Sequence, residues 1–351
     1  MGLESPEQSP SSRATMSDVA RVAGVSIKSV SRVINDELPV SAKLREKVKS
    51  AIATLDYIPN PAARSLAGTR TFVLGILFDN PSPHYTIKIQ KGAYKACVET
   101  GYHLRIDHID SALGKDFLID QLSALLRHSR TDGFVLTPPL TDNRLVLDHL
   151  DRSGLPYIRI APVIDHGRSP EVRIDDTAAA ATAAQFLWDK GHRRFGLING
   201  PAAHGAAANR RRGFLERIDQ LAPGATVMES NGDFSFASGL AAGRDLLATA
   251  KPPSAIFAAN DDMAAGLMVA CAERGLQVPR AISVIGFDDS WIATSVWPYL
   301  TTVHQPIEDM AYTAVRQLLS REVDEPSSVE LDYHIVERDS VLPISSLASS
   351  A

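Results

Sequence analysis

The chain has little cysteine and no long apolar segment. Its two cysteines, Cys97 and Cys271, lie far apart in 351 residues, and no metal-type spacing of Cys and His surrounds either one. We interpret both as free thiols in a reducing compartment, where disulfides are rare. No stretch supplies the roughly 20 apolar residues that a membrane-spanning helix needs. These absences argue against a disulfide-rich secreted protein and a membrane protein, and we expect a cytoplasmic location.

Sequence motifs of catalysis are also missing. The ten histidines form no HExxH pair, and the chain contains neither GxSxG nor a GxxxxGK[ST] phosphate loop. The segment AGVSIKS superficially resembles a nucleophile element, but it lies within a basic helical region. We therefore expect no enzymatic activity, no catalytic residues, no metal site and no cofactor.

Charge is distributed unevenly along the chain. Residues 13–70 contain ten Lys or Arg against five Asp or Glu, a net charge of +5, whereas residues 71–351 have a net charge of −8. A basic segment on an acidic body indicates a polyanionic partner for that segment alone. Residues 1–14, which are rich in Ser, Pro and Glu, have the composition of a disordered leader.

The basic segment has the pattern of a helix-turn-helix. Thr15 or Ser17 can cap a first helix that ends at Gly24, and Ser26 is a good N-cap for a second helix. The second helix has its apolar stripe at Val30, Val33 and Ile34. A third amphipathic helix follows, with Leu44, Val48, Ile52 and Leu55 on one side.

The polar face of the second helix carries candidate base-reading residues. A helix-turn-helix presents this face to the major groove. Lys28 and Arg32 can donate to guanine, and Ile27 can pack against a thymine methyl group. A solvated face of a small helical bundle would have the same pattern, so the pattern alone leaves DNA binding open.

Residues 16–68 closely resemble the headpiece and hinge of the lactose/galactose-repressor (LacI/GalR) family of bacterial transcription regulators. The resemblance rests on the signatures AGVS…VSRVIN and YIPN..AR.LAG. It implies a DNA-binding headpiece at 15–60 that reads half of a palindromic operator. It also implies a hinge helix and linker at 61–70 that folds when two protomers meet over the minor groove.

The same resemblance implies roles for individual residues of the headpiece and hinge. The base-reading positions are Ile27, Lys28 and Arg32, and the backbone contacts are Ser26, Ser31 and Asn35. The minor-groove hinge positions are Asn60, Ala63 and Leu66. Leu66 matches a leucine that wedges into the central base step, although a packing residue in a linker is the alternative.

From Thr71 onward, short apolar runs alternate with amphipathic segments, which is typical of doubly wound parallel sheets. The strand candidates are FVLGILF, YHLRID, GFVLTPP, PYIRIAP, RFGLING, ATVMES, AIFAAND and SVIGFDD. The pattern runs twice, and several candidates end in Asp, Asn or Pro. We therefore expect two lobes that face each other across a cleft, with polar groups at the carboxyl ends of the strands.

The resemblance extends more loosely over this second region. It implies an effector-binding and dimerisation domain at 71–345, with the bilobed α/β fold of periplasmic sugar-binding proteins. The expected N-lobe comprises about 71–170 and 301–325, and the expected C-lobe about 171–300 and 326–345. Three crossings between the lobes are thus expected near residues 170, 300 and 325.

The resemblance also implies an effector site in the cleft. Asp288 matches a carboxylate that accepts hydrogen bonds from ligand hydroxyls, although a strand-end Asp that caps a turn is the alternative. The effector-binding candidates are Tyr85, Arg210, Phe234, Asn260 and Asp288, with Asp79 and Trp297 as weaker ones. Ala206 and Asp176 depart from the more usual family residues, so the resemblance does not identify the effector.

The sequence as a whole predicts a transcription repressor that binds double-stranded operator DNA as a homodimer. The tail after residue 331 lacks the leucine heptads of a coiled coil, so a dimer is expected rather than a tetramer. A small sugar is the expected effector, releasing the repressor from its operator. Two alternatives stay open: a corepressor-dependent regulator that binds a purine or a sugar phosphate, and a constitutive regulator without an effector.

Overall fold

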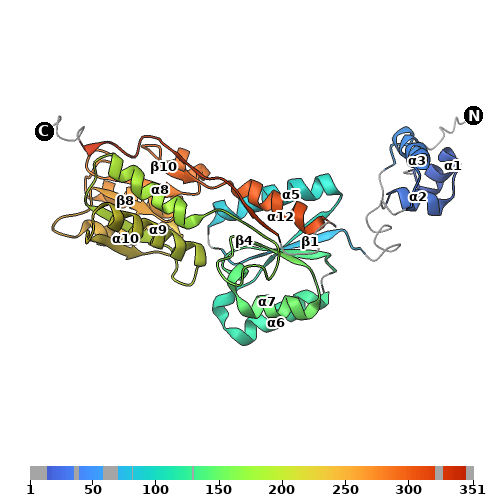
Figure 1. Ribbon diagram of the computed structural model, residues 1–351, viewed down its shortest axis with the longest axis horizontal. Helices are drawn as coiled ribbons and strands as arrows, with labels where there is room; N and C mark the ends of the chain where they lie inside the picture. The colour runs from blue at the N-terminus through green and yellow to red at the C-terminus, as the bar shows by residue number, and fades with distance from the viewer. Residues whose placement is uncertain are drawn as a thin grey trace, which may run out of the picture. The chain divides into compact units, whose positions relative to one another are not determined.

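The computed structural model describes residues 14–34, 39–57, 70–80, 82–128, 130–320 and 327–344. It divides into two compact units, residues 1–72 and 73–351. Figure 1 traces both units from the N-terminus to the C-terminus.

The small unit is a bundle of three helices, α1 (Met16–Ala23), α2 (Ile27–Ile34) and α3 (Ala42–Thr54). Thr15 caps α1 in a reciprocal capping box with Asp18, and Gly24 ends it at a φ of 65°, in the left-handed region that glycine adopts without strain. The bundle closes over Val19, Val30 and Val48, which are all fully buried. The predicted helix-turn-helix is therefore confirmed.

The large unit contains two six-stranded sheets. The first has the order β11-β5-β4-β3-β1-β2 and is parallel throughout. Its strands are β1 (Val73–Phe78), β2 (His103–His108), β3 (Gly133–Leu136), β4 (Tyr157–Ile160), β5 (Glu171–Arg173) and β11 (Ser328–Glu330). The central strands β3 and β4 are buried along their whole length, and β3 is accordingly a continuous apolar run, whereas β4 also buries Arg159.

The second sheet has the order β12-β10-β9-β8-β6-β7. Its strands are β6 (Phe195–Asn199), β7 (Val227–Asn231), β8 (Ala255–Ala258), β9 (Ser283–Phe287), β10 (Thr301–His304) and β12 (His334–Val336). All its pairs are parallel except β10 with β12, which is antiparallel. The predicted bilobed α/β fold is confirmed, with this one antiparallel edge added.

Helices cover both faces of each sheet. In the first lobe α5 and α12 lie together on one face and α6 and α7 on the other, as Figure 1 shows. In the second lobe α8 pairs with α9, and α10 pairs with α11. The bounds are α5 (Pro83–Thr100), α6 (Lys115–His128), α7 (Arg144–Ser153), α8 (Asp176–Asp189), α9 (Gly205–Leu221), α10 (Phe236–Leu247), α11 (Asp261–Glu273) and α12 (Ile307–Leu319).

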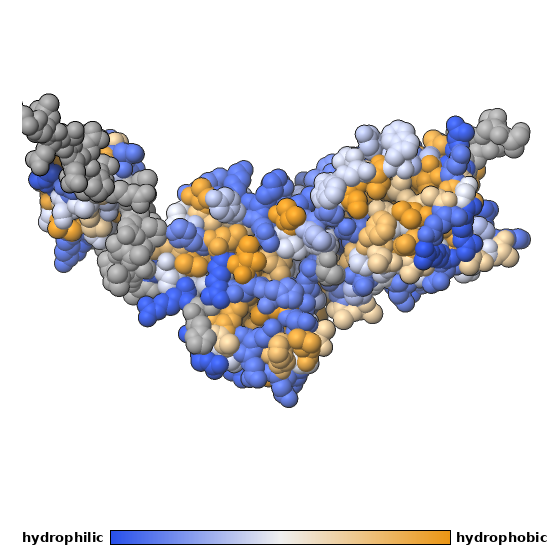
Figure 2. Space-filling view, turned by 180° about the vertical axis from the view of Figure 1, so that it is seen from behind, coloured by the Kyte–Doolittle hydropathy of each residue, from blue (hydrophilic) through white to orange (hydrophobic). Residues whose placement is uncertain are grey.

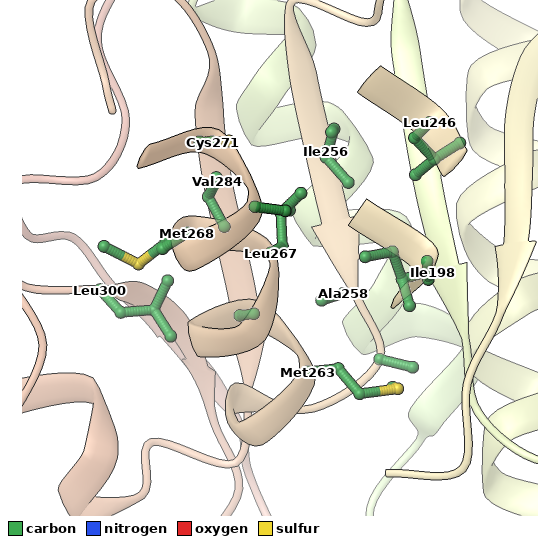
Figure 3. Packing of buried hydrophobic residues seen from close by; sticks show 14 of the residues in the cluster. Ile198, Leu246, Ile256, Ala258, Met263, Leu267, Met268, Cys271, Val284 and Leu300 are labelled. Carbon is green, nitrogen blue, oxygen red and sulfur yellow. The ribbon is translucent and has the colours of Figure 1, made fainter. Parts of the chain in front are cut away.

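The core of the second lobe lies between α10, α11 and the sheet. Figure 3 shows Leu267 of α11 pointing toward Ile256 of β8, with Val284 of β9 close by. All three side chains are fully buried. This packing fixes the carboxyl ends of the strands, from which the side chains described below project.

The chain crosses between the lobes three times, after β5, after β10 and after β11. Each crossing lies a few residues later than expected. β5 and β11 belong to the first sheet, although residues 171–300 and 326–345 were expected in the C-lobe. β10 belongs to the second sheet, although residue 301 was expected to start the return to the N-lobe. These strands have only three or four residues, too few to show a periodic pattern.

Candidate functional site

A narrow cavity of about 20 Å³ lies between the two lobes of the large unit. All five effector-binding candidates of the sequence line it together, although they come from distant parts of the chain. The lining residues are Asn80, Ser82, Tyr85, Pro138, Ala161, His204, Ala206, Arg210, Phe234, Asn260, Asp288 and Gln305.

The two weaker candidates lie elsewhere. Asp79 accepts hydrogen bonds from the backbone N–H of Ser111, at 3.1 Å, and from its hydroxyl group, so its carboxylate holds the turn after β2. Trp297 is 79% exposed and packs against Tyr299, with ring centroids 5.5 Å apart. The structure does not bring either side chain to the cavity.

Asp288 stands directly after β9, at the carboxyl edge of the second sheet. Its φ of 106° is unfavourable for a residue with a side chain, and its N–H donates to the carbonyl of Val303 at 2.9 Å. Its Oδ1 accepts from Nε2 of Gln305 at 2.9 Å. Burial raises the pKa of Asp288 to about 6, although the positive charges of Arg210 and Lys88 oppose the shift. This carboxylate is the strongest hydrogen-bond acceptor of the cavity lining.

Arg210 is held in place by close packing between α8 and α9. A Cβ atom at Gly213 would lie 2.0 Å from the carbonyl oxygen of Thr177, so only glycine permits this approach. One turn earlier, Arg210 donates from Nε to Asp176 at 2.7 Å and from Nη1 to the carbonyl of Ala259 at 2.7 Å. Its guanidinium group also stacks over Phe287 at 3.6 Å. Protein groups thus already engage much of this cation.

A hydrogen bond joins Asn260 and Phe234 at the cavity wall. Nδ2 of Asn260 donates to the carbonyl of Phe234 at 2.9 Å, and its Oδ1 accepts from the N–H of Met263 as the N-cap of α11. Phe234 has a φ of 71°, and its ring packs edge-on to that of His204, with centroids 4.9 Å apart. Tyr85 completes the wall from α5, where burial raises the pKa of its hydroxyl group.

Direct hydrogen bonds join the two lobes beside the cavity. The Ser82 hydroxyl donates to Oδ2 of Asp262 at 2.9 Å, and Nε2 of His84 lies 3.2 Å from its Oδ1. Nζ of Lys88 donates to the carbonyls of Asp288 and Asp289 at 3.0 and 2.7 Å. In this arrangement the first lobe therefore closes over the carboxyl edge of the second sheet.

Four polar residues of the cavity lining were missed in the sequence: Asn80, Ser82, His204 and Gln305. Gln305 follows β10, a strand that the sequence pattern did not indicate. His204 follows β6 by five residues, and it precedes α9 as its N-cap. Both obey the rule that ligand-facing side chains follow the carboxyl ends of parallel strands, so their positions held the signal.

The helix α2 exposes the base-reading candidates of the small unit. Ile27 is 51% exposed, and Lys28 and Arg32 are also exposed. Ser26 accepts from the N–H of Ser29 at 3.1 Å at the start of the helix, and Ser31 is half-buried. Four further candidates lie outside the described residues: Asn35, Asn60, Ala63 and Leu66.

Two absences hold for the described ranges of the chain. Within these ranges no group of three or more His, Cys, Asp or Glu side chains is placed to hold a metal ion. No helix of the described segments combines the length and apolar character needed to cross a membrane.

Comparison with known proteins finds matches over nearly the whole chain. Residues 15–60 match the model of the bacterial regulatory proteins of the lacI family, and residues 184–341 match a periplasmic binding protein-like domain. The ribose operon repressor of Escherichia coli (strain K12) is 34% identical, over 88% of this chain and 93% of its own length.

Two further similarities cover slightly more of the chain. The HTH-type transcriptional repressor PurR of Escherichia coli O139:H28 (strain E24377A / ETEC) is 32% identical, over 93% of this chain and 97% of its own. The structure of the lac repressor dimer bound to operator and the anti-inducer ONPF has a TM-score of 0.73 and 28% identity. This similarity covers 94% of this chain and 99% of that one.

Proposed function

Because the chain belongs to the lacI family of bacterial regulatory proteins and is a DNA-binding repressor controlled by a small effector, we propose that a sugar is this effector and releases the protein from a palindromic operator. The observation that carries the proposal is the cavity between the lobes. It combines the carboxylate of Asp288, a strong acceptor for hydroxyl groups, with the aromatic ring of Phe234.

The similarity to the ribose operon repressor supports a sugar as the ligand class. The effector-binding residues in this proposal are Tyr85, Arg210, Phe234, Asn260 and Asp288. Arg210 and Asn260 act mainly by holding the walls, since their side chains bond to protein groups.

On DNA, two protomers would bind half-sites about one helical turn apart, with α2 of each in the major groove. Lys28 and Arg32 would read base edges beside Ile27, and Leu66 would enter the minor groove between the half-sites. A homodimer is supported by the similarity to the lac repressor dimer. Figure 2 also shows apolar patches on the surface of the large unit. Among its exposed apolar side chains are Ile87 and Val98 of α5, which are 53% and 58% exposed.

The proposed switch is a change in lobe closure that the effector causes. A ligand shifts a conformational equilibrium only through different affinities for the two states. The effector must therefore bind the state with low operator affinity more tightly, and operator DNA must weaken effector binding by the same factor. Such a repressor acts in the cytoplasm, where the DNA is, and needs no catalytic residue.

Thermal unfolding against a panel of monosaccharides, disaccharides, sugar phosphates and purines tests the proposal. A ligand at about 100 times its dissociation constant adds about 2.7 kcal/mol to the free energy of unfolding. We expect a sugar to raise the melting temperature and to release a labelled operator fragment. A purine or sugar phosphate as the only stabilising ligand would favour a corepressor, and no stabilisation at all would favour a constitutive regulator.

A further inference from the structure

His204 is a buried histidine whose two ring nitrogens both lack a hydrogen-bond partner. Its side chain lines the cavity and the residue is 7% exposed. Another buried histidine, His192, uses both nitrogens, with Nδ1 3.1 Å from the hydroxyl of Ser254 and Nε2 3.1 Å from the carbonyl of Leu342. Leaving a buried polar atom without a partner is unfavourable, so the ring of His204 is prepared for a group that enters the cavity.

The ring of His204 is neutral at physiological pH. Burial lowers its pKa to about 3, and the positive charge of Arg210 acts in the same direction. A neutral imidazole has one N–H donor and one nitrogen acceptor. A hydroxyl group can both donate and accept, and it therefore matches either nitrogen, whereas an anion can only accept.

The charge of the cavity also disfavours anions. Among the described residues that line it, Arg210 is the only Lys or Arg. Its Nε lies 2.7 Å from Asp176, and its Nη1 lies 3.7 Å from Asp288. Nearby Lys88 donates to two backbone carbonyls at the edge of the second sheet. Two carboxylates thus offset the one guanidinium group, which leaves no uncompensated positive charge for a phosphate.

We propose that His204 is a specificity-determining residue, which exchanges hydrogen bonds with hydroxyl groups of a neutral sugar while the cavity rejects the phosphorylated form. The inference rests on the proposed function and narrows its ligand class. In the complex Asp288 accepts from one hydroxyl group of the sugar and His204 bonds to another, so the ring of His204 gains the partner that it lacks in the free protein. The ring of Phe234 packs edge-on against that of His204 and keeps the imidazole in place.

Isothermal titration of the full chain tests this selectivity. The probes are D-ribose, D-xylose and D-glucose, with ribose 5-phosphate and glucose 6-phosphate as their charged counterparts. We expect the neutral sugar that binds most tightly to bind at least about tenfold more tightly than any phosphate ester, because the ester brings an uncompensated charge into the cavity. A phosphate ester that binds as tightly as the best neutral sugar would overturn the inference.

Two variants at position 204 and one matched control separate recognition from structure. His204→Leu should weaken binding of the neutral sugar by about tenfold and leave the melting temperature of the free protein unchanged or higher, since two unpaired polar atoms are removed. His204→Gln, which keeps a donor and an acceptor, should lose less than about threefold. His192→Leu should lower the melting temperature and leave sugar affinity unchanged.

The outcomes distinguish this inference from the function on which it rests. Sugar binding that His204→Leu leaves intact refutes the role of His204 while the sugar-controlled repressor stands. Absence of binding by every neutral sugar refutes both. A lower melting temperature of His204→Leu with unchanged sugar affinity would show that the histidine is a packing residue.

Discussion

The two lobes contribute to the cavity unequally. The second lobe supplies the charged groups that line it, Arg210 and Asp288, together with His204 and Phe234. The first lobe supplies the neutral side chains of Asn80, Ser82 and Tyr85 and the edges of Pro138 and Ala161. The difference indicates that the second lobe recognises the chemistry of the ligand, whereas the first lobe mainly covers it.

The largest effect on stability is expected when the hydrophobic core of the second lobe is weakened. Leu267→Ala removes a fully buried side chain from the core shown in Figure 3. The free energy of unfolding should fall by about 2–5 kcal/mol, through lost burial and a residual cavity. Urea unfolding followed by circular dichroism measures it. Val269→Ala on the same helix, where the side chain is 40% exposed, should change stability by less than about 1 kcal/mol.

Recognition by the second lobe is tested by removing its carboxylate. Asp288→Ala should weaken effector binding by about 100-fold, because a charge-assisted hydrogen bond contributes about 1.5–3 kcal/mol. Operator binding by the free protein should persist. The matched control is Asp79→Ala in the first lobe, which should leave effector affinity unchanged because its carboxylate faces Ser111. Equal losses in the two variants would contradict the division between the lobes.

The pH dependence of effector binding sharpens the same comparison. The pKa of Asp288 in the free protein is raised to about 6, and the ionised form accepts the ligand hydroxyls. Affinity should therefore be highest above pH 6 and fall about tenfold between pH 7 and pH 5 as the carboxyl becomes protonated. Burial also raises the pKa of Asp261, to about 8. The carboxyl group of Asp261 accepts hydrogen bonds from the hydroxyl of Thr302 and the N–H of Ser290, so we do not expect it to bind the effector.

The stability of the free protein depends on pH in the opposite direction. A carboxyl with a raised pKa favours the folded state at low pH, so this contribution is lost as pH rises from about 4 to 6. Titrations at each pH with the wild type and with Asp288→Asn measure both effects. The variant should show a flatter affinity profile. An unchanged profile would mean that another group controls binding.

The smallest effect is expected when a contact between the first lobe and the second lobe beside the cavity is removed. Asp262→Ala removes the acceptor that binds Ser82 and His84 of the first lobe. We expect effector affinity to fall by about two- to fivefold, since one partly buried link between the lobes is lost while Asp288 remains. Small-angle scattering should show a more open large unit. A loss as large as that of Asp288→Ala would place recognition in the closure contacts instead.

The sequence predicted the fold and much of the cavity lining because both depend on strong local signals. Apolar runs that end in polar residues indicated the strands, and the family resemblance placed Asp288, Asn260 and Arg210. Asp79 and Trp297 were placed less well, because their surroundings are set by tertiary contacts that no local pattern encodes. The position of His204 after β6 marks it as a residue that can face a ligand, but it does not show that both ring nitrogens lack a partner. The importance of His204 comes from the absence of a partner for its ring, which only the folded structure reveals.

The three connections between the lobes restrict the motion that an effector can exploit. The first and third are bonded to each other, since Leu331 donates from its N–H to the carbonyl of Arg173 at 2.9 Å. With one connection alone, the lobes could rotate relative to each other about any axis. Three connections restrict this rotation to a single hinge axis. The open cleft therefore gains little conformational entropy, and little is lost when a ligand closes it. A weakly bound small effector can then use most of its binding free energy to shift the equilibrium between the two conformations.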